Sequence, residues 1–258
     1  MPRNLPPLRL APLLLLLATP SALSPSPARA ESAFTLPLTN AGRQPDIVDR
    51  WSGRILASRA DVGRGDFATA RRAATAVIKD MLARIEKGTT ARLLLGSAAY
   101  VRAIAEMGEG KDAEATWDVA VAFALAPELR GYDPVSEGVM GEKVLEALRE
   151  EEQRFGGEPP TEDTLGTESE VAPPKRLEAP RPRYPEGKRR GRVQAAIAVR
   201  IVIDSQGQVH LPTLLEGDDP SLIYSGFEAL RKWRFEPARA GGEPVTVWYK
   251  LTINYALR

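Results

Sequence analysis

Residues 229–258, ALRKWRFEPARAGGEPVTVWYKLTINYALR, decide the fold of the C-terminal part of this chain. Basic residues follow the end of a predicted helix, and a W-x-F-x-P-A sequence comes next. A Gly-Gly turn then leads into one long strand in which apolar and polar residues alternate. Alternation is typical of a strand with one face in a core, so we expect Trp233 and Phe235 to fasten the helix to a sheet.

The long strand divides its residues between two faces. One face holds Val245, Val247, Tyr249, Leu251, Ile253, Tyr255 and Leu257, and the other holds Thr246, Trp248, Lys250, Thr252 and Asn254. We expect a strand of this length to outrun its partners and to leave backbone N–H and C=O groups unpaired. An edge of that kind is either a liability or a docking site for another strand.

The preceding segments complete a small sheet. Residues 191–204, GRVQAAIAVRIVID, alternate in the same way, and DSQG follows as a hairpin turn in which Gly207 suits a positive φ. The next strand, 208–216, contains Pro212, which cannot donate to a ladder. We therefore expect this strand to lie at the outside of the sheet or to carry a bulge.

A helix with a clear start joins that strand to the opening stretch. Asp219 can cap it and Pro220 suits its first position. Its apolar stripe consists of Ile223, Phe227, Leu230 and Trp233, and its last turn is expected to carry Arg231, Lys232 and Arg234. These elements predict an antiparallel sheet with helices on one face.

In order, RPRYP (181–185), GRVQAAIAVRIVID, GQV, ALRKWRFEPA and GGEPVTVWYKLTINYAL resemble the C-terminal domain of the TonB family, from about residue 182 to 258. The resemblance implies a three-stranded antiparallel sheet with two helices. It also implies binding of short extended segments of outer-membrane transporters by strand addition. The residues that the resemblance assigns to partner binding are Tyr184, Pro185, Val247, Tyr249, Leu251, Ile253 and Tyr255.

The region 31–154 has the pattern of a helical domain. Phe67, Ala70, Ala74, Val77, Ile78 and Met81 form one apolar stripe at helical spacing. Gly65 with Ala70, and Gly110 with Ala115, share the G-x4-A spacing of a tetratricopeptide hairpin, which the region resembles. The two copies lie farther apart than the usual ~34-residue period, so a generic helical bundle is the alternative. The predicted fold class is therefore α+β with two domains, all-α and then TonB-like.

The remaining segments are a leader and a linker. Residues 1–30 have a basic start, a short apolar run and an A-x-A site at Ala28–Ala30, which together predict a cleaved signal peptide. We therefore expect a periplasmic protein, with an uncleaved inner-membrane anchor as the alternative. Residues 155–181 are acidic and then rich in proline, and we interpret them as a flexible linker.

Composition excludes several classes of site. The chain has no cysteine and one histidine, His210, so thiol chemistry, Cys-based metal sites and paired-His sites are excluded. His210 lies in a predicted strand and is interpreted as an ordinary surface or half-buried side chain. The carboxylates fall in linkers and on helix faces without convergent partners, so we expect no catalytic residue, no metal and no cofactor.

Three functions fit these patterns. The preferred one is a periplasmic interaction protein, not an enzyme, that binds partner proteins by strand addition and is not itself energised. The alternative is an energy transducer that acts on outer-membrane receptors with a proton-motive motor; the lack of a His-bearing membrane helix argues against it. The third is an envelope structural protein that contacts peptidoglycan or forms a homodimer through its last strand.

One further surface feature is a basic cluster, which consists of Lys188, Arg189, Arg190 and Arg192. It is interpreted as a solvated face near a helix end, with contact to anionic lipid as the alternative. Nucleic acid is not an expected partner of an exported protein.

Overall fold

The computed structural model describes residues 46–131, 138–155 and 171–256. All of the described residues belong to one compact unit, Ala33–Arg258. The predicted signal peptide, residues 1–30, lies outside the described residues. Among the helices that the structure describes, none is long and apolar enough to cross a membrane.

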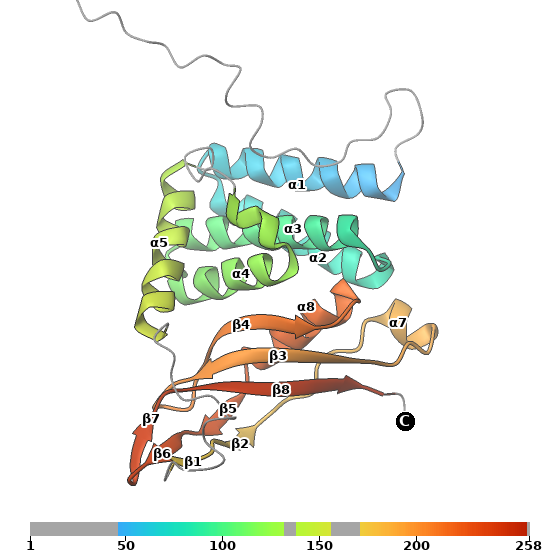
Figure 1. Ribbon diagram of the computed structural model, residues 1–258. Coiled ribbons are helices and arrows are strands. Elements are labelled where there is room, and N and C mark those ends of the chain that lie inside the picture. Colours follow the sequence, from blue (N-terminus) through green and yellow to red (C-terminus); the bar gives the residue numbers. More distant parts are fainter. Residues whose placement is uncertain (1–45, 132–137, 156–170, 257–258) are drawn as a thin grey trace, which may run out of the picture. The chain divides into compact units, whose positions relative to one another are not determined.

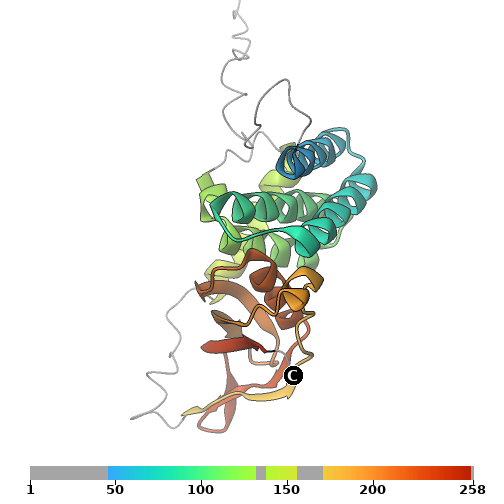
Figure 2. The ribbon, with the colours of Figure 1, turned by 90° about the vertical axis from the view of Figure 1, so that its right-hand side faces the viewer.

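The N-terminal half is built from helical hairpins, as predicted. Its elements are α1 (Ile47–Gly63), α2 (Phe67–Arg84), α3 (Thr89–Gly108), α4 (Asp112–Leu125), the 3₁₀ helix η2 (Pro127–Gly131) and α5 (Gly138–Phe155). Gly65 and Gly110 occupy the α1–α2 and α3–α4 turns with φ of 77° and 72°, where the repeat-like spacing placed them. Figure 2 shows α1 and α2 (blue to cyan) side by side, in agreement with their contacts.

The C-terminal half contains the predicted three-stranded antiparallel sheet. Its strands are β3 (Ala195–Ile203), β4 (Val209–Glu216) and β8 (Val247–Tyr255), in the order β4-β3-β8, and its helices are α7 (Glu186–Arg190) and α8 (Pro220–Leu230). The side chain of Asp219 caps α8 by accepting from the backbone N–H groups of Ser221 and Leu222. The predicted stripe from Ile223 to Trp233 is buried. The fold is therefore α+β, with both halves of the expected kind.

Two details of this region differ from the prediction. Helix α8 ends at Leu230, so Arg231, Lys232 and Arg234 lie beyond its last turn, and Arg234 begins the short strand β5 (Arg234–Glu236). Part of the predicted linker also forms strands. The segments β1 (Val171–Ala172) and β2 (Lys175–Glu178) pair with β6 (Ala238–Ala240) and β5, and β6 also pairs with β7 (Glu243–Val245).

The sequence pattern does not indicate β2, because this strand is held by backbone pairing and by a cation–π contact. The guanidinium of Arg176 lies 4.6 Å from the centroid of the Trp233 ring. All four side chains of β2 are exposed, and Leu177 is among them. A strand without a buried face has no apolar period, and only its distant partners reveal it. The rest of the predicted linker, 156–170, lies outside the described residues.

The two edges of the sheet differ in how they are covered. In β4, Leu211 has a positive φ of 45° and the register with β3 shifts beside Pro212, which confirms both the outer position and the bulge. Helix α4 packs against this strand, as Figure 1 shows. At the other edge, β8 pairs with β3 without a shift from Val247 to Tyr255. The prediction that the last strand outruns its partners was therefore wrong, because β3 matches its full length.

Candidate functional site

The outer edge of β8 is the first candidate site. Among the described residues, β8 pairs with β3 alone in the order β4-β3-β8. In an antiparallel pair, every second residue directs its N–H and C=O groups away from the partner strand. The edge of β8 therefore presents a row of hydrogen-bonding groups along a strand of nine residues. Such a row can accept another strand.

The strand residues that the sequence assigned to partner binding have inward-facing side chains. Val247, Leu251, Ile253 and Tyr255 are buried, Val247 completely. Tyr249 is half-buried, and its ring lies 5.9 Å from that of Phe235. These side chains belong to the core, so the groups that they can offer to a partner are those of the backbone.

Tyr184 lies near the end of β8 and packs against it, and Pro185 is the buried residue that precedes α7. The Tyr184 ring packs edge-on against Tyr255, with 5.4 Å between centroids, and its hydroxyl donates to the carbonyl of Val193. The Tyr255 hydroxyl donates to the carbonyl of Leu222 at 2.8 Å, and burial raises the pKa of this hydroxyl. Tyr184 therefore contacts β8, and it does so through packing between the two tyrosine rings.

The other face of β8 carries its exposed side chains. Lys250, Thr252 and Asn254 are exposed, and Trp248 is half-buried. The guanidinium of Arg200, on β3, lies 4.8 Å from the centroid of the Trp248 ring. The alternation in the sequence predicts this face as distinct from the core face, and no functional role was predicted for it.

Residues 180–257 match the family model described as Gram-negative bacterial TonB protein C-terminal. This region is a TonB C-terminal domain. The solution NMR structure of the Pseudomonas aeruginosa TonB C-terminal domain is 24% identical, and the match covers 35% of this chain and 97% of that one with a TM-score of 0.30. No curated protein matches the chain.

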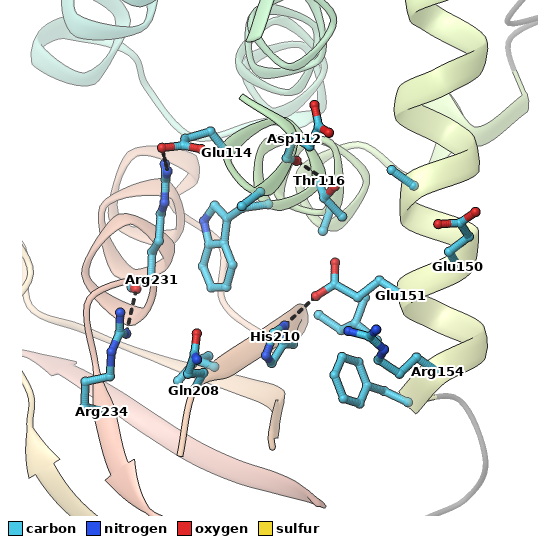
Figure 3. A pocket seen from close by; sticks show the side chains of 17 residues that line it. Asp112, Glu114, Thr116, Glu150, Glu151, Arg154, Gln208, His210, Arg231 and Arg234 are labelled. Atoms are coloured by element: carbon cyan, nitrogen blue, oxygen red, sulfur yellow. Dashed lines mark hydrogen bonds and ion pairs between the residues drawn. The ribbon is translucent and has the colours of Figure 1, made fainter. Parts of the chain in front are cut away.

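A cavity of about 570 Å³ lies between α4, α5 and the β4 side of the TonB domain (Figure 3). His210 lines it, with Nδ1 2.7 Å from a carboxylate oxygen of Glu151 and Nε2 3.0 Å from one of Asp204. A neutral imidazole carries one N–H, so only the imidazolium can donate to both carboxylates. The interpretation of His210 as an ordinary side chain was therefore incomplete. Glu151 lies 59 residues away, and no local pattern could have indicated the contact.

The pKa of His210 should lie above its usual value of about 6.5. Partial burial alone would lower its pKa, but the hydrogen bonds to Glu151 and Asp204 outweigh that effect and raise it. The protonated contact therefore stabilises the fold fully below a pH of about 6.5, and this contribution is lost as the pH rises through the folded-state pKa. His210 is the single histidine, so one imidazole C–H signal in a proton NMR titration reports it. We expect a midpoint above 6.5, and a lower midpoint in Glu151→Gln; a wild-type midpoint at or below 6.5 would contradict the prediction.

A second polar cluster joins the helices to the TonB domain, and all of its members except Glu228 are almost completely buried. Arg102 of α3 donates to both carboxylate oxygens of Asp118 of α4, one of them at 2.7 Å. It also reaches Glu228 of α8 at 3.4 Å and Glu106 at 3.8 Å. Burial, reinforced by the Asp118 carboxylate, raises the pKa of Glu106 to about 8. Three acidic side chains, from α3, α4 and α8, share one guanidinium, an arrangement that joins three helices.

Metal binding has no support in the part of the chain that the structure describes. There, no three or more Asp, Glu or His side chains are placed to hold a metal ion. The carboxylates near His210 and Arg102 are occupied by those cations. The free edge of β8 therefore stays the best candidate for function.

Proposed function

We propose that this chain is a periplasmic interaction protein that binds partner proteins by adding a partner strand to the outer edge of β8. The observation that carries the proposal is the difference between the two edges of the TonB domain sheet. One edge, β4, is broken by a bulge at Pro212 and packed against α4. The other, β8, is regular over nine residues and pairs on one side among the described residues.

The partner class follows from the family. TonB C-terminal domains bind proteins such as outer-membrane receptors, and the proposed ligand is an extended segment of such a receptor. Main-chain hydrogen bonds would supply affinity, because the core-facing side chains of β8 are buried. In this proposal the residues from Val247 to Tyr255 act through their backbone, and Tyr184 acts by fixing the end of the strand.

Hydrogen–deuterium exchange of the full chain tests the proposal. The probes are synthetic peptides copied from the periplasm-facing extended segments of outer-membrane transporters. At a peptide concentration of ten times Kd, we expect the outward-facing amides of 247–255 to exchange about tenfold more slowly. The reason is that these amides acquire partners only when a strand is added.

The same measurement contains its own control. The amides of 209–216, in β4, should keep their exchange rates, because α4 already packs against that strand. Peptide binding that protects β4 or the helices while β8 is unchanged would overturn the proposal. A complete lack of protection by every transporter segment would remove this partner class.

A further inference from the structure

A single imidazole connects the end of α5 to the TonB domain. His210, on β4, lies 2.7 Å from Glu151 of α5 through Nδ1 and 3.0 Å from Asp204 through Nε2. Figure 3 shows the Glu151 side chain reaching from α5 to the imidazole. At the end of α5, the buried ring of Phe155 lies 4.7 Å from the His210 ring, measured between centroids. The end of α5 therefore contacts this imidazole twice, through a carboxylate and through an aromatic ring.

The two carboxylates differ in how freely they can move. Asp204 lies in the turn between β3 and β4, and its Oδ1 accepts from the backbone N–H groups of Gln206 at 2.9 Å and Gln208 at 2.8 Å. It therefore belongs to the same hairpin as His210. Glu151 belongs to α5, which packs on α3 and α4. Of the two, only Glu151 can move away from the imidazole without opening the hairpin.

Loss of one proton removes one of the two hydrogen bonds. A neutral imidazole carries a single N–H group, so its other nitrogen would direct a lone pair at a carboxylate oxygen, and the two would repel. Because Asp204 is fixed in the turn, the contact that opens is the one with Glu151. Protonation of His210 therefore favours the attached position of α5, and deprotonation favours its release.

Other charged groups around the imidazole are engaged elsewhere or exposed. Those that line the same cavity are Asp112 and Glu114 of α4, Glu150 and Arg154 of α5, and Arg231 and Arg234 after α8. Arg231 pairs with Glu114 at 3.4 Å, and Arg234 donates to two backbone carbonyl groups. The other three are exposed, so solvent screens their charges. Among the described residues, the carboxylates that pair with the imidazole are those of Glu151 and Asp204.

We propose that Glu151, His210 and Asp204 form a pH-dependent latch, which holds the end of α5 on the TonB domain while the imidazole is protonated and releases it when the proton is lost. Release would expose Phe155 and open the cavity of about 570 Å³ on the side of α5. The contact between His210 and Asp204 stays within the hairpin in both states. The latch therefore changes the attachment of α5 and leaves the sheet as it is.

Hydrogen–deuterium exchange of the full chain between about pH 5.5 and 8.5, the range in which histidine titrates, tests the latch. The protection factor compares each amide with an unstructured peptide at the same pH, so the intrinsic effect of pH on exchange cancels. We expect the protection of residues 148–155 to fall as the pH rises. The fall should be about tenfold for each unit by which the pKa of His210 is higher with α5 attached than with α5 released. It should be complete once the pH passes the midpoint of the His210 signal in the proton NMR titration.

Two substitutions on α5 make the test specific. Glu151→Gln removes the carboxylate and keeps the size of the side chain, so the protection of 148–155 should no longer depend on pH. Glu152→Gln is the matched control, because Glu152 pairs with Arg130 at 2.8 Å, and the fall should persist in this variant. Equal protection of 148–155 across the pH range in the wild type would overturn the latch. A fall that persists unchanged in Glu151→Gln would overturn it as well, and neither result would affect strand addition at β8.

Discussion

Replacing Arg102 with methionine should lower the free energy of unfolding by about 3–5 kcal/mol, as expected when one partner of a buried ion pair is removed. Arg102 is 8% exposed and Asp118 is fully buried. Without the guanidinium, the carboxylate of Asp118 would remain in the interior with no cation at hydrogen-bond distance, beside Glu106, whose raised pKa already keeps it mostly protonated at neutral pH. Chemical denaturation of the full chain at neutral pH measures the effect.

Arg130→Met is the matched control. Arg130 also bonds a carboxylate, that of Glu152 at 2.8 Å, and its guanidinium lies 4.7 Å from the centroid of the Phe123 ring. Its side chain is 52% exposed, so we expect a loss of about 1 kcal/mol or less. Equal effects of the two substitutions would show that the Arg102 cluster is no more important than a surface ion pair.

The double variant Arg102→Met, Asp118→Leu separates charge from packing. Removing both partners leaves no uncompensated carboxylate at position 118, so part of the lost stability should return. Glu106 would still be buried, but its carboxyl group already has a pKa of about 8 and is mostly protonated at neutral pH. A double variant less stable than Arg102→Met would mean that Asp118 acts through contacts other than the ion pair.

Much of the C-terminal sheet could be predicted because its signals are local. The alternation in β3 and β8 gives both strands and their buried faces, and Asp219-Pro220 gives the start of α8. The tetratricopeptide-like turns at Gly65 and Gly110 are likewise local, since both positions adopt a positive φ. Each of these features depends on a few neighbouring residues, so the sequence alone is enough to predict it.

The side-chain contacts that could not be predicted from the sequence all join residues that lie far apart in the chain. His210 meets Glu151, Arg102 meets Asp118 and Glu228, and Arg176 meets Trp233. In none of these pairs do both residues lie in the same helix or strand, so no hydrophobic periodicity or local motif indicates the contact. The same limit explains the partner-binding prediction. The sequence indicated β8, but which of its groups face outward depends on β3 and α8, and only the fold supplies that information.

Replacing Gly207 with alanine should destabilise the TonB domain by roughly 3 kcal/mol or more. Gly207 has a φ of 75° in the β3–β4 turn, a conformation that costs an L-residue about 1–2 kcal/mol. A Cβ at this position would also overlap the carbonyl oxygen of Phe235, whose own N–H donates to the Gly207 carbonyl at 2.9 Å. Relieving the overlap must move β5 or the turn, and overpacking of this kind costs about 1–3 kcal/mol more.

Gly241→Ala separates the two contributions, because Gly241 also has a positive φ, 56°, but open space around its Cβ position. It should therefore show the backbone cost alone, about 1–2 kcal/mol. Thermal and urea denaturation of both variants give the comparison. If the two losses are equal, the turn and β5 can separate freely and the Gly207–Phe235 contact contributes nothing. A larger loss at Gly207 means that this close approach ties the β3–β4 turn to β5, the strand that follows α8.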